Sequence, residues 1–573
     1  MTQTEPALVA ALRAIVGGRH VLTDPRATTR YRTGYRAGAG AAIAVVRPGS
    51  LVEQWRVAQA CVAAGVSIIL QASNTGLTGG STPDGDDYPG GVVIVSTSRL
   101  TGVHVVRDGA QVVCLPGATL DALERILLPL GREPHSVIGS SCLGASVVGG
   151  ICNNSGGSLI QRGPAFTQLA LYGAVGADGS LRLVNHLGID LGDDPEAMLR
   201  RVEAGGFTAA EVDACDDRWA HDHSYVDHVR EIDSDRPARF NADPRCLFEA
   251  SGSAGKLIVF AVRLDTFARQ TGGATFYIGT NDPAKLTDLR RTILGGFSAL
   301  PIAGEYLHRT AFDIADTYGK DMFAAIERIG TSRLPRLFAA KARVDAWSDR
   351  IGLFGPHLSD RVMQRIGRLL PDHLPPRMRA FRDRFEHHLI LKMPDAGVAE
   401  ARALLAETFG GADADFFECT AEEARKAFLH RFVTAGAAVR YRAVHRDTVE
   451  DIVALDIALP RNAREWREHL PAQISADVVH ALYYGHFFCH VFHQDYVVRK
   501  SSDPLALEHL MWDLLDARGA EYPAEHNVGH LYHAKPALAD FYRALDPVNQ
   551  LNPGIGHTPR GRGWNAAGRD IVA

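Results

Sequence analysis

Hydrophobic positions in the first 265 residues follow two spacings that predict different elements. Short runs rich in Val and Ile predict strands at residues 42–49, 66–71, 91–97, 103–108 and 110–117. Apolar residues three and four apart predict helices at residues 50–65 and 119–131. The strands follow one another closely enough for hairpins and a mixed sheet, so the pattern predicts an α+β fold.

The pattern changes further along the chain. A strand followed by a helix is predicted again at residues 272–293, and Gly, Pro and Asn clusters begin near residue 515. Because 573 residues are too many for one core, we expect several domains. We expect a first domain at 1–265 completed by 515–573, a second domain at 266–515, and a basic, partly helical insertion at 325–392 within the second.

Composition narrows the class of protein. The net charge of −5 argues against a nucleic-acid-binding chain. The eight cysteines are scattered without a CxxC pair, which fits a reducing compartment and predicts neither a zinc ribbon nor a disulfide framework. Glu5 and Arg13 make the N-terminal stretch an amphipathic helix rather than a signal peptide. The sequence contains no uninterrupted apolar run of about 18 residues, so no membrane-spanning helix is predicted.

Two glycine-rich stretches point to a large ligand. Residues 71–85, QASNTGLTGGSTPDG, follow a predicted strand, and their backbone N–H groups can form an anion-binding nest. The stretch matches neither the P-loop nor the GxGxxG pattern, and an ordinary tight turn is the alternative. Residues 135–164 hold seven more glycines and six serines. Two such loops in one domain predict that both wrap one extended ligand, such as a dinucleotide.

Several motifs carry a family resemblance. The stretches QASNTGLTGGS (71–81), PGATL (116–120), GASVVGGICNNSGG (144–157) and LDPVNQLNPG (545–554) resemble the vanillyl-alcohol oxidase / p-cresol methylhydroxylase flavoproteins. AGEYLHR, YPAEHNVGHLY and NPGIG make the chain similar to the quinone-dependent D-lactate dehydrogenases over nearly its whole length. The resemblance implies a two-subdomain FAD-binding domain, an α+β cap domain and a basic membrane-docking insertion.

The resemblance also implies the residues that contact FAD. It assigns this role to Ala72, Ser73, Asn74, Thr75, Gly76, Gly80, Ser81, Gly139, Ser146, Gly156 and Val259. Each lies in a Gly/Ser loop or at the end of a predicted strand, where backbone donors are available. Related enzymes attach the flavin to a His or Cys, but His135 is better interpreted as a loop residue, so we expect noncovalent FAD.

Oxidising a 2-hydroxy acid requires a cation for the carboxylate, a base for the hydroxyl proton and a hydride acceptor. Arg431 matches a substrate-binding Arg of the relatives, and Arg suits bidentate binding of a carboxylate. A surface salt bridge is the alternative for Arg431. By the same resemblance His526 is the base, since it follows the Glu of the motif EHNVGH.

His486, His493 and Glu525 match the metal ligands of the related D-2-hydroxyglutarate dehydrogenases. The seven-residue spacing of the two histidines places them on opposite faces of one strand or on one face of a helix. The interior of HFFCHVFH departs from the relatives' Gly-Asp-Gly-Asn, so a site with a divalent metal and a site without one both stay open. His490, in the same apolar stretch, is expected to be a core residue.

The basic segment at 333–392 has thirteen Lys/Arg and six Asp/Glu, a local charge of +7. Its Arg residues alternate with Leu, Phe and Trp, as in helices that lie on membranes. We expect residues 361–385 to dock on an anionic lipid surface, worth about 1 kcal/mol per basic residue. Nucleic acid is the rival partner, but no recognised motif accompanies the segment.

Together these observations predict an enzyme that oxidises D-lactate to pyruvate through FAD and passes electrons to quinone. The expected location is the cytoplasmic face of the bacterial inner membrane, as a peripheral protein. One alternative is an FAD enzyme for another D-2-hydroxy acid, such as D-2-hydroxyglutarate. The other is a non-catalytic flavin-binding module at the membrane.

Overall fold

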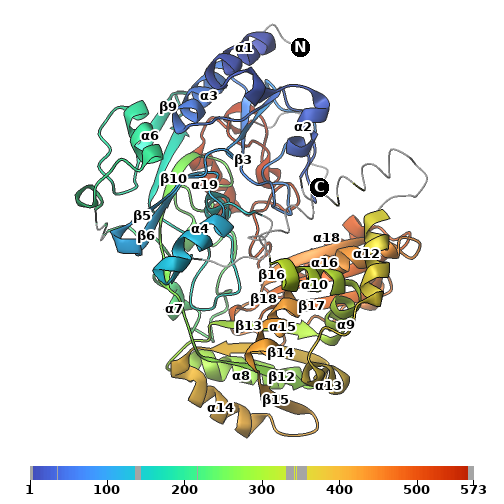
Figure 1. The fold of residues 1–573 in the computed structure, drawn as a ribbon. Coiled ribbons are helices and arrows are strands. Elements are labelled where there is room, and N and C mark those ends of the chain that lie inside the picture. The colour runs from blue at the N-terminus through green and yellow to red at the C-terminus, as the bar shows by residue number, and fades with distance from the viewer. Residues whose placement is uncertain are drawn as a thin grey trace.

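The protein is described by a computed structural model that covers residues 4–34, 36–135, 144–213, 215, 217–330, 341, 344 and 358–565. The first and the last parts of the described chain lie in the upper part of Figure 1, and the middle of the chain forms the lower part. Gly139 and most of the segment between 331 and 357 lie outside the described residues. Of the helices described, none is long and apolar enough to cross a bilayer.

The N-terminal part is built on a small mixed sheet. Its strand order is β1-β2-β4-β3, with β2 and β3 both parallel to β4 and β1 antiparallel to β2. The strands are β1 (Val21–Leu22), β2 (Ala44–Val46), β3 (Ser67–Gln71) and β4 (Val92–Ser96). Helices α1 (Thr4–Val16), α2 (Pro25–Arg32) and α3 (Leu51–Ala64) accompany it. The predicted mixed sheet is thus confirmed.

A second sheet follows in the same upper part of Figure 1. Its five strands are all antiparallel in the order β5-β6-β10-β8-β9. They are β5 (Val103–Val106), β6 (Gln111–Cys114), β8 (Ala170–Val175), β9 (Leu181–Asn185) and β10 (Ile258–Asp265). Around them lie α4 (Leu120–Leu127), α5 (Val147–Cys152), α6 (Pro195–Ala204), α7 (Tyr225–His228) and the pair β7 (Arg132–Glu133) and β11 (Phe267–Ala268).

The end of the chain returns to the first sheet. After α19 (Pro536–Leu545), the backbone N–H of Ile68 donates to Gln550 O (3.0 Å), and the N–H of Asn552 donates to Ile68 O (2.8 Å). Residues near 551 therefore lie beside β3, the strand that leads into the first glycine-rich loop.

The lower part is one seven-stranded antiparallel sheet in the order β15-β12-β14-β13-β17-β18-β16. The strands are β12 (Ala274–Thr280), β13 (Ala303–His308), β14 (His387–Met393), β15 (Ala414–Glu418), β16 (Val449–Ala458), β17 (Val478–His486) and β18 (Val491–Arg499). All residues of β13 are buried, as expected for a strand covered on both faces.

Helices cover both faces of this sheet. Apolar side chains of α8 (Pro283–Gly296), α14 (Asp395–Thr408) and α18 (Pro504–Ala517) share one core cluster with it. The opposite cluster contains α9 (Arg309–Tyr318), α10 (Lys320–Ile329), α13 (Pro376–Arg384), α15 (Ala421–Phe432) and α16 (Thr434–Val444). The short α17 (Ala472–Ser475) precedes β17. Because helices pack on both faces, the sheet is a rigid support for residues at the ends of its strands.

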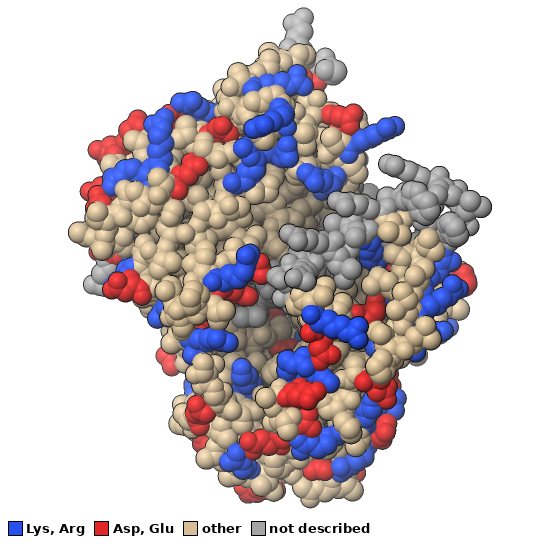
Figure 2. Space-filling model, in the orientation of Figure 1, with Lys and Arg blue, Asp and Glu red and all other residues tan. Residues whose placement is uncertain are grey.

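The end of the basic segment, from residue 376 on, packs into the core of this part. We had expected residues 361–385 to lie on a lipid surface, so the buried positions differ from that expectation. In α13, Met378 and Phe381 are buried in the core, and β14 is an interior strand of the sheet. The arginines of α13 pair with acidic side chains, for example Arg382 Nε with Asp313 Oδ1 (2.6 Å). In Figure 2 acidic and basic side chains are accordingly interspersed over this part of the surface.

In helix α12 (Leu358–Leu369), apolar and basic side chains are exposed side by side. Val362, Ile366 and Leu369 lie at helical spacing and are 42%, 50% and 86% exposed. Arg365 and Arg368 on the same helix are also exposed. The exposed apolar residues flanked by Arg that were expected over residues 361–385 are therefore found on α12, whereas the large apolar side chains of α13 are buried.

Candidate active site

A single cavity of about 1280 Å³ lies between the glycine-rich loops and the seven-stranded sheet. This exceeds the roughly 300–1,000 Å³ usual for small-molecule sites, so it has room for a dinucleotide and a small substrate. Its lining includes Ala72, Ser73, Asn74, Thr75, Gly76, Gly80, Ser81, Ser146, Gly156 and Val259. It also includes Arg431, His486, His493, Glu525 and His526. Every expected site residue within the described part of the chain thus faces one cavity.

Hydrogen bonds from side chains to backbone carbonyls fix the shape of the first loop. Asn74 adopts a left-handed conformation (φ 52°), and its Nδ2 donates to Thr33 O (2.9 Å). Gln71, the last residue of β3, donates from Nε2 to Ser81 O (2.7 Å), which closes the loop on itself. A Cβ added at Gly76 would meet no atom within 4 Å. The loop therefore leaves an open cradle beside its backbone, as the pyrophosphate of FAD requires.

The second loop and β10 supply the other walls. Ser146 caps α5 by accepting a hydrogen bond at Oγ from Gly149 N (3.1 Å). Val259 lies in β10 opposite Tyr172 of β8. A Cβ at Gly156 would overlap the Glu525 carboxyl group. Gly156 is therefore required for the close approach of Glu525, whereas the sequence had pointed only to the flavin.

His486 and His493 meet through a β-hairpin. His486 ends β17, residues 487–490 form the turn, and His493 lies in β18, so neither one strand nor one helix relates them as predicted. His490 sits in this turn with φ 57°, is buried, and donates from Nδ1 to Pro460 O (2.9 Å), which confirms it as a core residue. The rings of His486 and His493 are 5.2 Å apart and perpendicular.

Glu525 completes this cluster. Its Oε2 lies 3.3 Å from His486 Nε2 and 3.8 Å from His493 Nε2. Burial alone would raise the pKa of Glu525, but the charges of His486 and Arg239 outweigh it and hold the pKa below its usual value. Arg239 is buried and forms an ion pair with Glu525 Oε1. Three donor atoms therefore converge from different parts of the chain.

Two further carboxylates orient the histidines from behind. Glu305 of β13 accepts from His486 Nδ1 at Oε1 (2.6 Å), and Asp456 of β16 lies 3.4 Å from His493 Nδ1. Burial lowers the pKa of His486, yet Glu305 and Glu525 together raise it to about 10. Without a metal, His486 therefore carries a proton between two carboxylates at neutral pH. With Nδ1 of both rings on a carboxylate, Nε2 of both faces Glu525, the arrangement found around protein-bound metals.

His526 lies beside this cluster on the same carboxylate. Asp456 Oδ2 accepts hydrogen bonds from His526 Nδ1 (2.6 Å) and from the backbone N–H of Glu525 (2.7 Å). Burial of the imidazole lowers the pKa of His526, but the negative charge of Asp456 outweighs it and raises the pKa overall. With Nδ1 held by Asp456, the ring presents its other nitrogen for proton transfer.

Arg431 is buried at the end of α15, so it is not part of a surface salt bridge. Its Nε lies 3.1 Å from Glu305 Oε2, and its guanidinium stacks 4.5 Å over the ring of Tyr484. Glu305 thus links Arg431 to His486. The stacked, paired guanidinium is fixed in position at the cavity wall.

Three residues of this network did not come from the sequence analysis: Arg239, Glu305 and Asp456. Asp456 is a lone carboxylate in the apolar run VALDIAL, and Glu305 is likewise alone in AGEYLH. A charge inside a buried strand must be paired. A single carboxylate inside an apolar strand therefore predicts a cationic partner, and this pattern could have identified both Glu305 and Asp456 from the sequence.

The fold and the cavity define the class: a flavoprotein oxidoreductase with an FAD-binding domain joined to a cap. A family model described as "FAD binding domain" matches residues 42–185, and one described as "D-lactate dehydrogenase, membrane binding" matches residues 275–564. The chain is 58% identical over 565 residues to quinone-dependent D-lactate dehydrogenase of Escherichia coli (strain K12), covering 98% of this chain and 99% of the relative. It is 53% identical over 558 residues to the enzyme of the same name from Haemophilus influenzae, covering 97% and 99%. The chain therefore belongs to the family of quinone-dependent D-lactate dehydrogenases.

Solved structures support the same fold at low sequence identity. The chain resembles p-cresol methylhydroxylase with substrate bound, with a TM-score of 0.55 and 12% identity over 97% of this chain and 98% of the other. It also resembles alkyldihydroxyacetonephosphate synthase, with a TM-score of 0.57 and 12% identity over 96% and 86%. The expected vanillyl-alcohol oxidase / p-cresol methylhydroxylase fold is thereby confirmed.

Proposed function

We propose that this protein oxidises D-lactate to pyruvate with FAD as the hydride acceptor and passes the electrons to a membrane quinone. The observation that carries the proposal is one cavity in which the glycine loops face Arg431 and His526. Membership in the quinone-dependent D-lactate dehydrogenase family supports the substrate and the acceptor.

FAD, when bound, supplies the two-electron acceptor. The residues of the two glycine loops and Val259 hold it, and we assign the same role to Gly139, outside the described residues. The flavin-binding unit comprises residues 1–265 and 515–573, and residues 266–515 close over it. The open cradle at Gly76 supports noncovalent binding of the pyrophosphate by backbone donors.

Arg431 and His526 divide the work on the substrate. Arg431 binds the lactate carboxylate, because a stacked guanidinium presents donors in a fixed orientation. His526 accepts the hydroxyl proton in its neutral form, while Asp456 retains the Nδ1 proton and stabilises the positive charge that develops on the ring. With FAD bound, the α-hydrogen of the substrate would leave with its electron pair, as hydride, to the flavin, while the hydroxyl carbon becomes a carbonyl.

A divalent metal of the zinc class is proposed at His486, His493 and Glu525. Their donor atoms lie within 4.8 Å of one another, and Glu305 and Asp456 orient the two rings. The metal would replace the proton now shared by His486 and the glutamates, and as a Lewis acid it would lower the pKa of the substrate hydroxyl. Chelation should lower the rate of flavin reduction, and one equivalent of zinc should restore it.

The protein associates with a membrane as a peripheral protein, as its family match indicates. We propose that α12 docks on anionic lipid at the cytoplasmic face of the bacterial inner membrane. The exposed Val362, Ile366 and Leu369 supply apolar contacts, and Arg365 and Arg368 face the lipid phosphates. Residues 325–392 around α12 form the membrane-associating part.

A panel of 2-hydroxy acids tests the substrate. D-lactate should give a higher kcat/KM for dye reduction than L-lactate or D-2-hydroxyglutarate. A higher kcat/KM for D-2-hydroxyglutarate would assign the enzyme to another D-2-hydroxy acid. Flavin that no 2-hydroxy acid reduces would indicate a non-catalytic flavin-binding module.

A further inference from the structure

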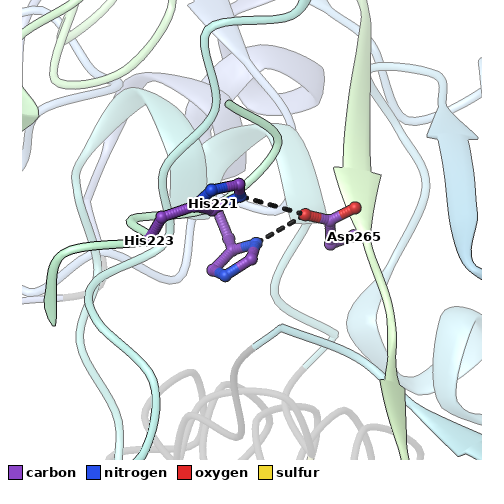
Figure 3. Close-up of side chains that lie close together, drawn as sticks. All are labelled: His221, His223 and Asp265. Carbon is purple, nitrogen blue, oxygen red and sulfur yellow. Dashed lines mark hydrogen bonds and ion pairs between the residues drawn. The ribbon is translucent and has the colours of Figure 1, made fainter. Parts of the chain in front are cut away.

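A second cluster of potential metal ligands lies outside the active site. His221 and His223 come from the loop before α7, and Asp265 is the last residue of β10. In Figure 3 both imidazole rings are turned toward the Asp265 carboxylate. His221 Nδ1 lies 2.5 Å and His223 Nε2 lies 3.8 Å from the same atom, Asp265 Oδ2. The proposed reaction uses none of these residues.

Asp265 is held in position from behind. Its Oδ1 accepts a hydrogen bond from Gln111 Nε2 (2.8 Å), and Gln111 Oε1 accepts from the buried Arg263 Nε (2.8 Å). This network fixes the carboxylate and leaves Oδ2 directed at the histidines. Such outer partners of a carboxylate are typical of protein metal sites.

The two imidazoles of the loop belong to the cluster, but Asp222, the residue between them, does not. The Asp222 carboxylate accepts hydrogen bonds from Ser224 N (3.1 Å) and Ser224 Oγ (2.7 Å), and it is not one of the three groups whose donor atoms converge. His223 stacks on Trp219, with ring centroids 5.3 Å apart. His221 packs edge-on against Phe267, 5.2 Å away. The aromatic neighbours limit the rotation of both rings.

We propose that His221, His223 and Asp265 bind a divalent transition metal of the zinc class. Two imidazoles and one carboxylate are ligands that zinc accepts, at about 2.0–2.2 Å each. Tetrahedral ligands at such distances lie roughly 3.4 Å apart. The three donor atoms lie within 4.8 Å of one another, so side-chain shifts below about 1 Å bring them to the spacing of zinc ligands.

The site would fasten the loop to the end of β10. His221 and His223 are 32% and 48% exposed at their side chains, so the ion can enter from solvent and keep water in its remaining position. At present the loop is attached there by the hydrogen bond from Asp265 N to Ala220 O (3.2 Å) and by the histidine contacts. Bound metal would add to these and stabilise the folded state.

Zinc uptake by the purified, FAD-containing protein tests the proposal. Equilibrium dialysis against micromolar zinc should show one equivalent fewer in His221→Ala/His223→Ala than in the wild type. Glu525→Gln, at the active site, should retain this equivalent, which separates the two sites. His186→Ala is the matched control, because His186 pairs with Glu249 (2.7 Å) at similar exposure and, among the residues that the structure describes, no third ligand joins them.

Two further results are expected. Zinc should raise the midpoint of thermal unfolding in Glu525→Gln, and the rise should disappear when both histidines are also replaced. Gln111→Met should weaken zinc binding at this site by about 10–100-fold, as loss of an outer partner does elsewhere. Equal zinc content in wild type and the double-histidine variant, or uptake only at millimolar zinc, would overturn the proposal. Flavin content measured in parallel verifies that each variant is folded.

Discussion

Replacing Asp456 by Asn removes one negative charge from the centre of the active site at almost constant volume. Asp456 receives the hydrogen bond of His526 Nδ1 (2.6 Å) and raises the pKa of that imidazole against the opposing effect of burial. The neutral ring is the base in the proposed reaction. Flavin reduction in the wild type should therefore increase with pH as His526 loses its proton.

The size of the effect follows from the lost interaction. A hydrogen bond to a charged group contributes about 1.5–3 kcal/mol, and one pKa unit corresponds to about 1.36 kcal/mol. The pKa of His526 should therefore fall in Asp456→Asn, because the charge that raises it is lost, and the acidic limb of the pH profile moves to lower pH. The plateau rate should fall by about 10²–10⁴-fold, because the tautomer of His526 and its developing charge lose their support.

The assay is anaerobic stopped-flow reduction of the bound flavin by D-lactate between pH 5 and 9. Asp495→Asn is the control, since Asp495 is a buried carboxylate of the same sheet that accepts from Tyr484 Oη (2.6 Å) instead of a histidine. The control should keep the position of the acidic limb. A limb that stays in place in Asp456→Asn would refute His526 as the base, even if the rate falls.

Three more predictions follow from the cofactor site and the membrane face. Acid precipitation should release the flavin into the supernatant, and flavin retained by the precipitate would contradict noncovalent binding. Gly76→Leu should fill the open cradle and empty the FAD site, while Gly296→Leu, whose added Cβ also meets no neighbour, should keep full flavin content. Vesicle binding should be lost in the α12 variant Arg365→Gln/Ile366→Ser/Arg368→Gln. In the wild type, binding to anionic vesicles should be sensitive to salt, because charges are screened over about 8 Å at physiological salt. The variant should still reduce a soluble dye. Arg377→Gln, which breaks the ion pair with Glu423, should leave vesicle binding unchanged; equal loss in both variants would contradict docking through α12.

Local patterns were sufficient for the strands and the glycine loops. The runs that form β2 to β6 are short, apolar and β-branched, so period and composition agreed on one structure. The loop at Gly76 follows directly from its position after β3. Long-range pairing was not accessible in the same way. A spacing of seven positions from His486 to His493 fits a strand or a helix, but the turn at His490 produces a hairpin.

Charge counts misled for a physical reason. The basic residues of 376–384 and their apolar neighbours looked interfacial, but a count does not reveal acidic partners that other helices supply. Asp313 of α9 and Glu423 of α15 neutralise Arg382 and Arg377, and Phe381 packs into the core. Gly156 shows the same limit, since its neighbour Glu525 lies far away in sequence.

A single turnover of the FAD-containing protein with D-lactate, in the absence of oxygen and quinone, decides whether the protein is a D-lactate dehydrogenase. The flavin absorbance should bleach, and one pyruvate should form per flavin reduced. His526→Ala should retain its flavin but bleach about 10²–10⁴-fold more slowly. Flavin that stays oxidised in the wild type, or bleaching without pyruvate, would contradict the assignment as a D-lactate dehydrogenase.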